Sequence, residues 1–109
     1  MNYTNKVVII TGATSGIGEA CASVFGAAGA KLVITGRNAQ KLAETAAMLR
    51  AKKLEVLPIL ADAGSEADNR RMAEEALAHF GQIDILINNA GISMRALFQD
   101  LDIEVFRKV

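Results

Sequence analysis

Four short apolar runs lie at regular intervals along the chain, and the segments between them carry apolar residues at every third or fourth position. The runs cover residues 6–10, 31–35, 55–61 and 84–88, are rich in Val and Ile, and do not alternate with polar residues. Runs of this kind are typical of strands that are buried on both faces. The pattern therefore predicts four buried strands separated by helices.

The segment after the first run has helical spacing and ends at Gly29. A helix in this position buries one continuous apolar stripe. The predicted stripe consists of Ile17, Ala20, Cys21, Val24, Phe25 and Ala28. Because a single cysteine cannot close an intramolecular disulfide, we expect Cys21 to be a small buried hydrophobe, and we predict no metal site.

The next two helices carry terminal signals. Asn38 is a good N-cap for the second helix, which is predicted to turn Leu42, Ala46 and Leu49 toward the core. In the third helix, Ser65 and Asp68 are spaced as in a capping box, Glu66 adds negative charge to the first turn, and Gly81 suits the left-handed position after the last turn. The apolar stripe of the third helix is Met72, Ala73, Ala76, Leu77 and Phe80. A fourth helix is predicted to begin near Asp102 and to continue to Val109.

The alternation of strands and helices predicts the fold class. Right-handed crossovers between such strands make them parallel and place helices on both faces of the sheet. We therefore expect one α/β domain over residues 1–109, a doubly wound parallel sheet of the Rossmann type with strand order 3-2-1-4. Proline cannot donate to a sheet ladder, so Pro58 places the third strand at an edge, with a bulge in a central strand as the alternative.

The stretch "TGATSGIG", Thr11 to Gly18, joins the first strand to the first helix. In a doubly wound sheet, ligands bind beside the carboxyl ends of the strands. Gly12 permits a tight turn, Gly16 lets a phosphate approach the backbone, and Gly18 lets the helix pack closely on its strand. The unpaired N–H groups at the helix start would then face an anion. No Gly-Lys-Ser/Thr follows, which excludes a Walker A loop.

Composition excludes several classes of partner. Twelve basic and twelve acidic residues cancel, and the basic residues are scattered, so nothing indicates nucleic acid. The apolar runs are too short to cross a bilayer, and residues 1–6 lack the apolar core of a signal peptide. We therefore expect a cytoplasmic protein that binds neither nucleic acid nor membranes.

Three motifs together resemble the short-chain dehydrogenase/reductase family: "TGATSGIG", "NNAG" at residues 88–91, and Asp62 at the end of the third strand. The resemblance covers essentially the whole chain. It implies that the first motif, including Thr14, Ser15 and Ile17, holds the pyrophosphate of a nicotinamide dinucleotide.

The resemblance also implies roles at the ends of the third and fourth strands. Asp62 would accept a hydrogen bond from the adenine amino group, with Ala63 beside it. The adenine ribose and the approach to the nicotinamide would be lined by Asn89, Ala90 and Gly91. An alternative stays open for each of two residues. Asp62 could be a turn residue without a ligand, and Asn88 could be a buried amide that ties strands together.

The end of the second strand distinguishes the two nicotinamide coenzymes in this fold. An acid there binds the ribose 2'-hydroxyl of NAD(H) and repels the 2'-phosphate of NADP(H). This chain has Gly36 in place of the acid, followed by Arg37, whose planar guanidinium suits a phosphate. The sequence therefore favours NADP(H) over NAD(H), and a surface arginine over the next helix is the alternative interpretation of Arg37.

The sequence assigns no catalytic residue. In the family that it resembles, a tyrosine and a lysine four positions later act at the carbonyl oxygen, but Tyr3 precedes no such lysine. His79 is expected on the surface in the last turn of the third helix. Ser93 and Arg95 are expected in a plain loop, with the border of a substrate cleft as the alternative. We therefore expect the coenzyme-binding part of a longer protein, truncated before the Tyr-x-x-x-Lys segment and inactive alone.

The complete protein implied by the resemblance is a homo-oligomeric oxidoreductase that transfers hydride between NADP(H) and a small alcohol or carbonyl substrate. Two other functions stay open. One is a non-catalytic nucleotide-binding module. The other is a methyltransferase-like domain, against which Gly36 and Arg37 argue because that class places an acid at the end of the second strand.

Overall fold

The described part of the chain forms four strands and three helices in strict alternation. The computed structural model describes residues 2–14 and 16–89. The elements are β1 (Val7–Thr11), α1 (Gly16–Ala27), β2 (Lys31–Gly36), α2 (Ala39–Ala51), β3 (Val56–Leu60), α3 (Glu66–Phe80) and β4 (Ile85–Asn88). The fourth predicted helix, Ser93 and Arg95 lie outside the described residues.

The four strands form one parallel sheet in the order β3-β2-β1-β4. Val8 of β1 is in register with Leu32 of β2 on one side and with Ile85 of β4 on the other. Pro58 pairs opposite Ile34 on β3, which is an edge strand of the sheet. The predicted fold class, strand order and edge position of the proline are therefore confirmed.

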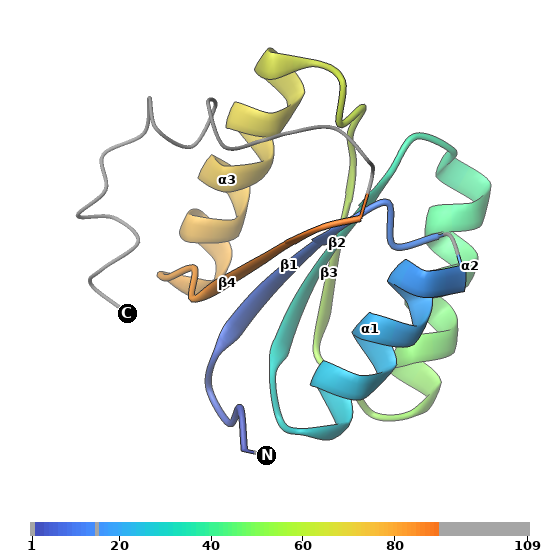
Figure 1. Ribbon diagram of the computed structural model, residues 1–109, viewed down its shortest axis with the longest axis vertical. Coiled ribbons are helices and arrows are strands. Elements are labelled where there is room, and N and C mark those ends of the chain that lie inside the picture. The colour runs from blue at the N-terminus through green and yellow to red at the C-terminus, as the bar shows by residue number, and fades with distance from the viewer. Residues whose placement is uncertain (1, 15, 90–109) are drawn as a thin grey trace.

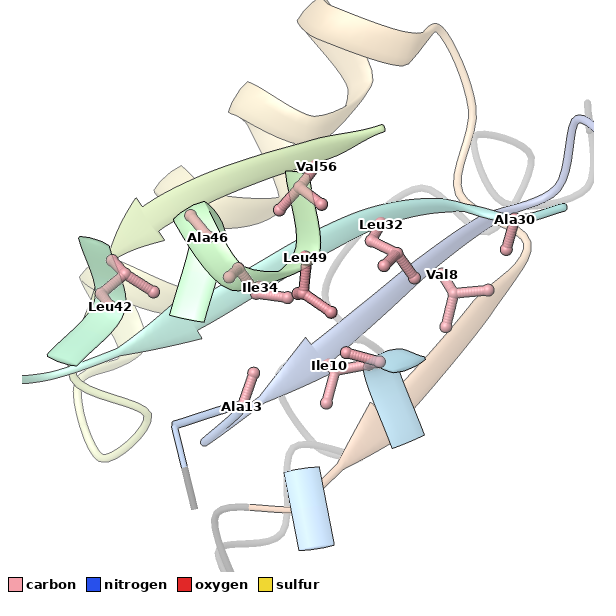
Figure 2. Close-up of a cluster of buried hydrophobic side chains, with 11 residues drawn as sticks. Val8, Ile10, Ala13, Ala30, Leu32, Ile34, Leu42, Ala46, Leu49 and Val56 are labelled. Carbon is pink, nitrogen blue, oxygen red and sulfur yellow. The ribbon is translucent and has the colours of Figure 1, made fainter. Parts of the chain in front are cut away.

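Helices cover both faces of the sheet, with α1 and α2 on one face and α3 on the other (Figure 1). Val7 and Ile9 of β1 point toward the α3 side, where Met72 and Ala76 are buried with them. The alternate residues of β1 pack with α1 and α2, and Figure 2 shows this second cluster, which includes Val8, Ile10, Leu32, Ile34, Leu42, Ala46 and Leu49. The central strands β1 and β2 are buried on both faces as predicted. The prediction is wrong for β3, where only Val56 and Ile59 are buried, and for β4, which has no buried residue, because both are outer strands of the described sheet.

The predicted stripe of α1 is wrong. Ile17 and Val24 are 72% and 66% exposed, and the buried residues of this helix are Gly18, Ala22 and Gly26. The reason is steric: a Cβ on Gly26 would lie 2.5 Å from a methyl group of Leu54. The helix therefore approaches the protein interior through its smallest residues, and Ile17 and Val24 face outward. Cys21 and Phe25 are half-buried beside the core.

The predicted helix ends are confirmed with one exception. The Asn38 side chain accepts from the Lys41 N–H at 3.0 Å, and the Ser65 hydroxyl accepts from the Asp68 N–H at 3.2 Å. Gly81 has a φ of 80°, in the left-handed region. However, the Asp68 carboxylate does not close a capping box on Ser65, because it accepts from the Asp62 N–H at 2.8 Å. The predicted core residues of α2 are buried, and those of α3 are buried or half-buried against the core.

Asp84 lies at the end of the sheet where the strands begin, and its side chain is only 7% exposed. Its Oδ2 accepts from the Val7 N–H and from Gln82 Nε2, both at 2.8 Å, and Lys6 Nζ lies 3.9 Å from Oδ1. A nearly buried carboxylate thus fixes the start of β1 against the start of β4.

Asp84→Ala is expected to lower the free energy of unfolding by about 2 to 3 kcal/mol, because the Val7 N–H loses a charged acceptor. Urea denaturation followed by circular dichroism measures this change. Asp84→Asn is the control, since it retains an acceptor oxygen and is expected to lose less. Equal stability of Asp84→Ala and the wild-type chain would contradict this role.

Candidate functional site: a cavity at the carboxyl ends of the strands

The loop after β1 turns sharply at Gly12, which has a φ of 62°. A side chain at this φ is strained, so the turn favours glycine. The next residue, Ala13, donates its N–H to the Thr35 carbonyl at 3.0 Å, which ties the loop to the end of β2. The predicted tight turn at Gly12 is confirmed.

The other two glycines have different surroundings. A Cβ on Gly18 would lie 2.4 Å from the Gly12 carbonyl oxygen and 2.8 Å from Asn89 Nδ2, so α1 can approach β1 only because position 18 has no side chain. The predicted close packing at Gly18 is therefore confirmed. A Cβ on Gly16 would meet no described neighbouring group within 4 Å. No described protein contact therefore requires glycine at position 16.

The end of β4 is bound to this loop. The Asn89 N–H donates to Thr11 Oγ1 at 3.1 Å, and Asn89 Nδ2 donates to the Gly12 carbonyl at 3.0 Å. The Thr11 hydroxyl lies 3.1 Å from Asn88 Oδ1, to which it donates. The alternative interpretation of Asn88 is therefore confirmed in part: its amide ties β4 to β1, but the residue is exposed and not buried. The amide that ties β4 to the glycine turn is that of Asn89.

The ends of the strands enclose a cavity of about 650 Å³. It brings together six of the predicted site residues: Gly12, Thr14, Arg37, Asp62, Ala63 and Asn89. Gly16, Ile17 and Gly18 lie in the first turn of α1, outside the lining. The predicted residues Ser15, Ala90 and Gly91 lie outside the described part of the chain.

Sequence reasoning did not name five other lining residues as site residues: Thr35, Gly36, Asn38, Lys41 and Ala61. Lys41 is the most consequential, because it adds a second cation beside Arg37. Both side chains are exposed, and neither forms an ion pair within residues 2–14 and 16–89. Lys41 lies in the first turn of a helix that starts directly after a strand, and this position was the signal that could have identified it.

Gly36 packs against the glycine loop. A Cβ at this position would lie 3.0 Å from Thr14 Cγ2. An acidic side chain at the end of β2 therefore requires the Thr14 side chain to shift by a few tenths of an ångström. The packing of the loop thus fits the absence of an acid here.

Asp62 is a turn residue and also lines the cavity. Its Oδ1 accepts from the Gly64 N–H at 2.9 Å, as the alternative interpretation proposed. Within the described part of the chain, its Oδ2 and the N–H of Ala63 have no hydrogen-bond partner. One acceptor and one adjacent donor are therefore available at the end of β3.

The only tyrosine and the only histidine lie away from this cavity. Tyr3 precedes β1, donates its backbone N–H to the Ala28 carbonyl, and packs on Phe25 with ring centroids 5.0 Å apart. His79 is exposed in the last turn of α3. Among the described residues, no three His, Cys, Asp or Glu side chains are grouped as metal ligands, and no helix has the length and apolar character to cross a membrane.

Comparison with known proteins identifies the family. A sequence model of the short chain dehydrogenases matches residues 6–109. The chain belongs to the short-chain dehydrogenase family. Dehydrogenase/reductase SDR family member 7B of Mus musculus is 47% identical over 112 residues, which cover 96% of this chain and 34% of that protein. This short-chain dehydrogenase chain thus spans about a third of the length of these curated relatives.

Solved structures of the short-chain dehydrogenase family include complexes with either coenzyme. A member from Burkholderia phymatum in complex with NAD is 36% identical, with a TM-score of 0.76, and the match covers 79% of this chain and 31% of that chain. A metagenomic member in complex with NADP is 34% identical, also with a TM-score of 0.76, and the match covers 82% and 40% of the two chains. The family is therefore one of NAD(P)-binding oxidoreductases.

Alanine substitutions at two glycines of the loop are expected to differ in their effect on stability. Gly18→Ala is expected to lower the free energy of unfolding by about 3 kcal/mol, because the added Cβ collides with backbone atoms that cannot rotate away. Gly16→Ala is expected to change it by less than about 1 kcal/mol, in the stabilising direction, because alanine favours a helix start over glycine and has space there. Urea unfolding of both variants tests the pair, and equal destabilisation would contradict the described packing.

Proposed function

We propose that this chain is the coenzyme-binding part of an NADP(H)-dependent short-chain oxidoreductase. The complete enzyme would transfer hydride between the nicotinamide and a small alcohol or carbonyl substrate. One observation carries the proposal: at the carboxyl ends of the strands, one cavity is lined by a glycine turn, by two cations without an ion pair among the described residues, and by an acceptor–donor pair. These groups match the pyrophosphate, the 2'-phosphate and the adenine of one dinucleotide.

The pyrophosphate would lie over the start of α1. The space beside Gly16 is free of described protein groups, and the first N–H groups of a helix have no partner within the helix. These groups and the positive end of the helix dipole favour an anion. Since no described protein contact requires glycine at position 16, a close-lying ligand supplies the reason for it.

The adenine would lie at the end of β3. Its exocyclic amine is a donor and its N1 is an acceptor on the same edge. The Oδ2 of Asp62 and the N–H of Ala63, which have no hydrogen-bond partner among the described residues, are complementary to that pair. Asn89, on the opposite wall of the cavity, would contact the ribose.

The 2'-phosphate would lie between the end of β2 and the start of α2. Arg37 and Lys41 both line this part of the cavity, and the N-terminus of α2, capped by Asn38, adds its partial positive charge. Glu19 and Glu44 share a second hollow with Lys41 and reduce its attraction for an anion. Arg37 is therefore the main phosphate ligand in this proposal, and Gly36 leaves no acid to oppose it.

The residues that transfer the proton at the carbonyl oxygen would lie outside this chain. The printed sequence contains no tyrosine followed four positions later by lysine, so no residue here can transfer a proton at the carbonyl oxygen in the manner of that pair. We therefore expect the 109 residues to bind coenzyme without turning over substrate. The substrate and the homo-oligomeric assembly would depend on segments of the longer protein.

Arg37→Ala is expected to weaken NADPH binding by about 1 to 3 kcal/mol and to leave NADH binding unchanged, because one charge-assisted contact to the 2'-phosphate is lost. Fluorescence titration of both coenzymes measures the two affinities. Arg70→Ala is the matched control, since Arg70 lies on α3 and pairs at 3.7 Å with the exposed Glu66. Equal weakening of NADPH and NADH binding would remove the argument for coenzyme preference.

A further inference from the structure

Three side chains of α3 hold the backbone where the chain leaves β3. Arg71 Nη2 donates to the Leu60 carbonyl at 2.6 Å, and Asp68 Oδ2 accepts from the Asp62 N–H at 2.8 Å. Asn69 Nδ2 donates to the Ala63 carbonyl at 2.8 Å. One helix thus fixes the peptide groups on both sides of the two residues that face the cavity.

Asn69 is the unusual member of this set. It is 5% exposed, and its Oδ1 is buried without a hydrogen-bond partner among the described residues. Burying an amide oxygen without a partner is unfavourable, and an apolar side chain of similar volume avoids that penalty. Packing alone therefore does not account for asparagine at this position. Its one hydrogen bond, to the Ala63 carbonyl, is the feature that an apolar residue cannot supply.

Asp68 is fixed in turn by its neighbours. Its backbone N–H donates to the Ser65 hydroxyl, and Arg71 Nη2 lies 3.8 Å from its Oδ1. Its other oxygen is thereby directed to the Asp62 N–H. The peptide between Asp62 and Ala63 is thus flanked by one bond from Asp68 and one from Asn69.

We propose that Asn69 and Asp68 are positioning residues for base recognition, which fix the Asp62 carboxylate and the Ala63 N–H so that the site selects adenine over hypoxanthine. This inference rests on the proposed function. Hypoxanthine presents a carbonyl oxygen where adenine has its amine, and an N–H where adenine has its N1 acceptor. Each group of the site then meets a like group of the base.

To select between the two bases, the Asp62 carboxylate and the Ala63 N–H must keep their orientation. A loop free to rotate about the Asp62–Ala63 peptide could turn the carboxylate toward the N–H of hypoxanthine and recover part of the binding. The bonds from Asp68 and Asn69 oppose that rotation from both sides of the peptide. Removing either bond is therefore expected to reduce the preference for adenine over hypoxanthine, with only a small effect on the free energy of unfolding.

The test compares the adenine and hypoxanthine forms of reduced NADP as ligands, with affinities from fluorescence titration. The wild-type chain is expected to prefer the adenine form by at least about tenfold, the value of one hydrogen bond to a charged group. Asn69→Leu and Asp68→Ala are expected to lower this preference to about threefold. Asp62→Ala, which lacks the carboxylate, is the reference variant, and it is expected to show no preference between the adenine and hypoxanthine forms.

The control is Glu66→Ala, which removes an acidic residue from the same helical turn as Asp68. Its carboxylate pairs with Arg70, 3.7 Å away, and makes no described contact with the loop after β3. This variant is expected to retain the full preference for adenine. Urea unfolding supplies a second readout: Asn69→Leu is expected to be at least as stable as the wild-type chain, because it removes a buried unpaired oxygen.

Failure of this inference is distinct from failure of the proposed function. Wild-type selectivity that persists in both Asn69→Leu and Asp68→Ala would overturn the positioning role and leave dinucleotide binding intact. A wild-type chain that binds both forms equally would also overturn it, whereas a chain that binds neither would overturn the proposed function. Unfolding of Asn69→Leu would show that the amide is needed for stability, which also contradicts the proposal.

Discussion

The close approach of α1 to the end of β1 determines the shape of the whole cavity. At Gly18 there is no room for even a methyl group between the helix and the Gly12 carbonyl oxygen. The same carbonyl accepts from Asn89, so the glycine turn and the end of β4 are held at one point. With the helix start fixed there, its first N–H groups, which have no partner within the helix, lie beside the space over Gly16, at the edge of the sheet where all four strands end.

The remaining parts of the site follow from the parallel sheet. Because the four strands run in one direction, the residues after β1, β2, β3 and β4 meet at a single edge. Each contributes a different chemistry: a glycine turn, a cation, a carboxylate with a free N–H, and an amide. A long ligand with anionic and aromatic parts can contact all of them at once. The short-chain dehydrogenase family binds such ligands, and the proposed preference of this chain for NADP(H) rests on the cation at the end of β2.

Sequence reasoning predicted the parts of the fold that depend on local chemistry. Pro58 indicated an edge strand because proline lacks a donor, and Asn38, Ser65 and Gly81 marked helix ends because their conformational preferences are intrinsic. The stripe of α1 was wrong because helical spacing alone does not fix which of two adjacent faces is buried. Large side chains were assigned to the interior, but the tight packing there admits only small ones.

The candidate site was predictable where a motif encodes it and not where tertiary contacts create it. Six predicted residues line the cavity, since the glycine turn and the strand ends are readable from order along the chain. The partners of Asp68 and Asn69 could not be predicted, because their bonds reach six residues back to a loop whose path depends on the docking of α3. Likewise, the exposure of Asn88 and the bridging amide of Asn89 depend on the register between β4 and β1.

The central claim is that an anionic linker binds the backbone at the start of α1. Amide NMR spectra recorded while NADP⁺ is added to the chain test it directly. We expect saturable shifts that are largest at the Gly16 and Ile17 amides, because the pyrophosphate oxygens would accept from N–H groups at the helix start. Saturable binding that leaves these two amides unshifted would contradict this binding mode.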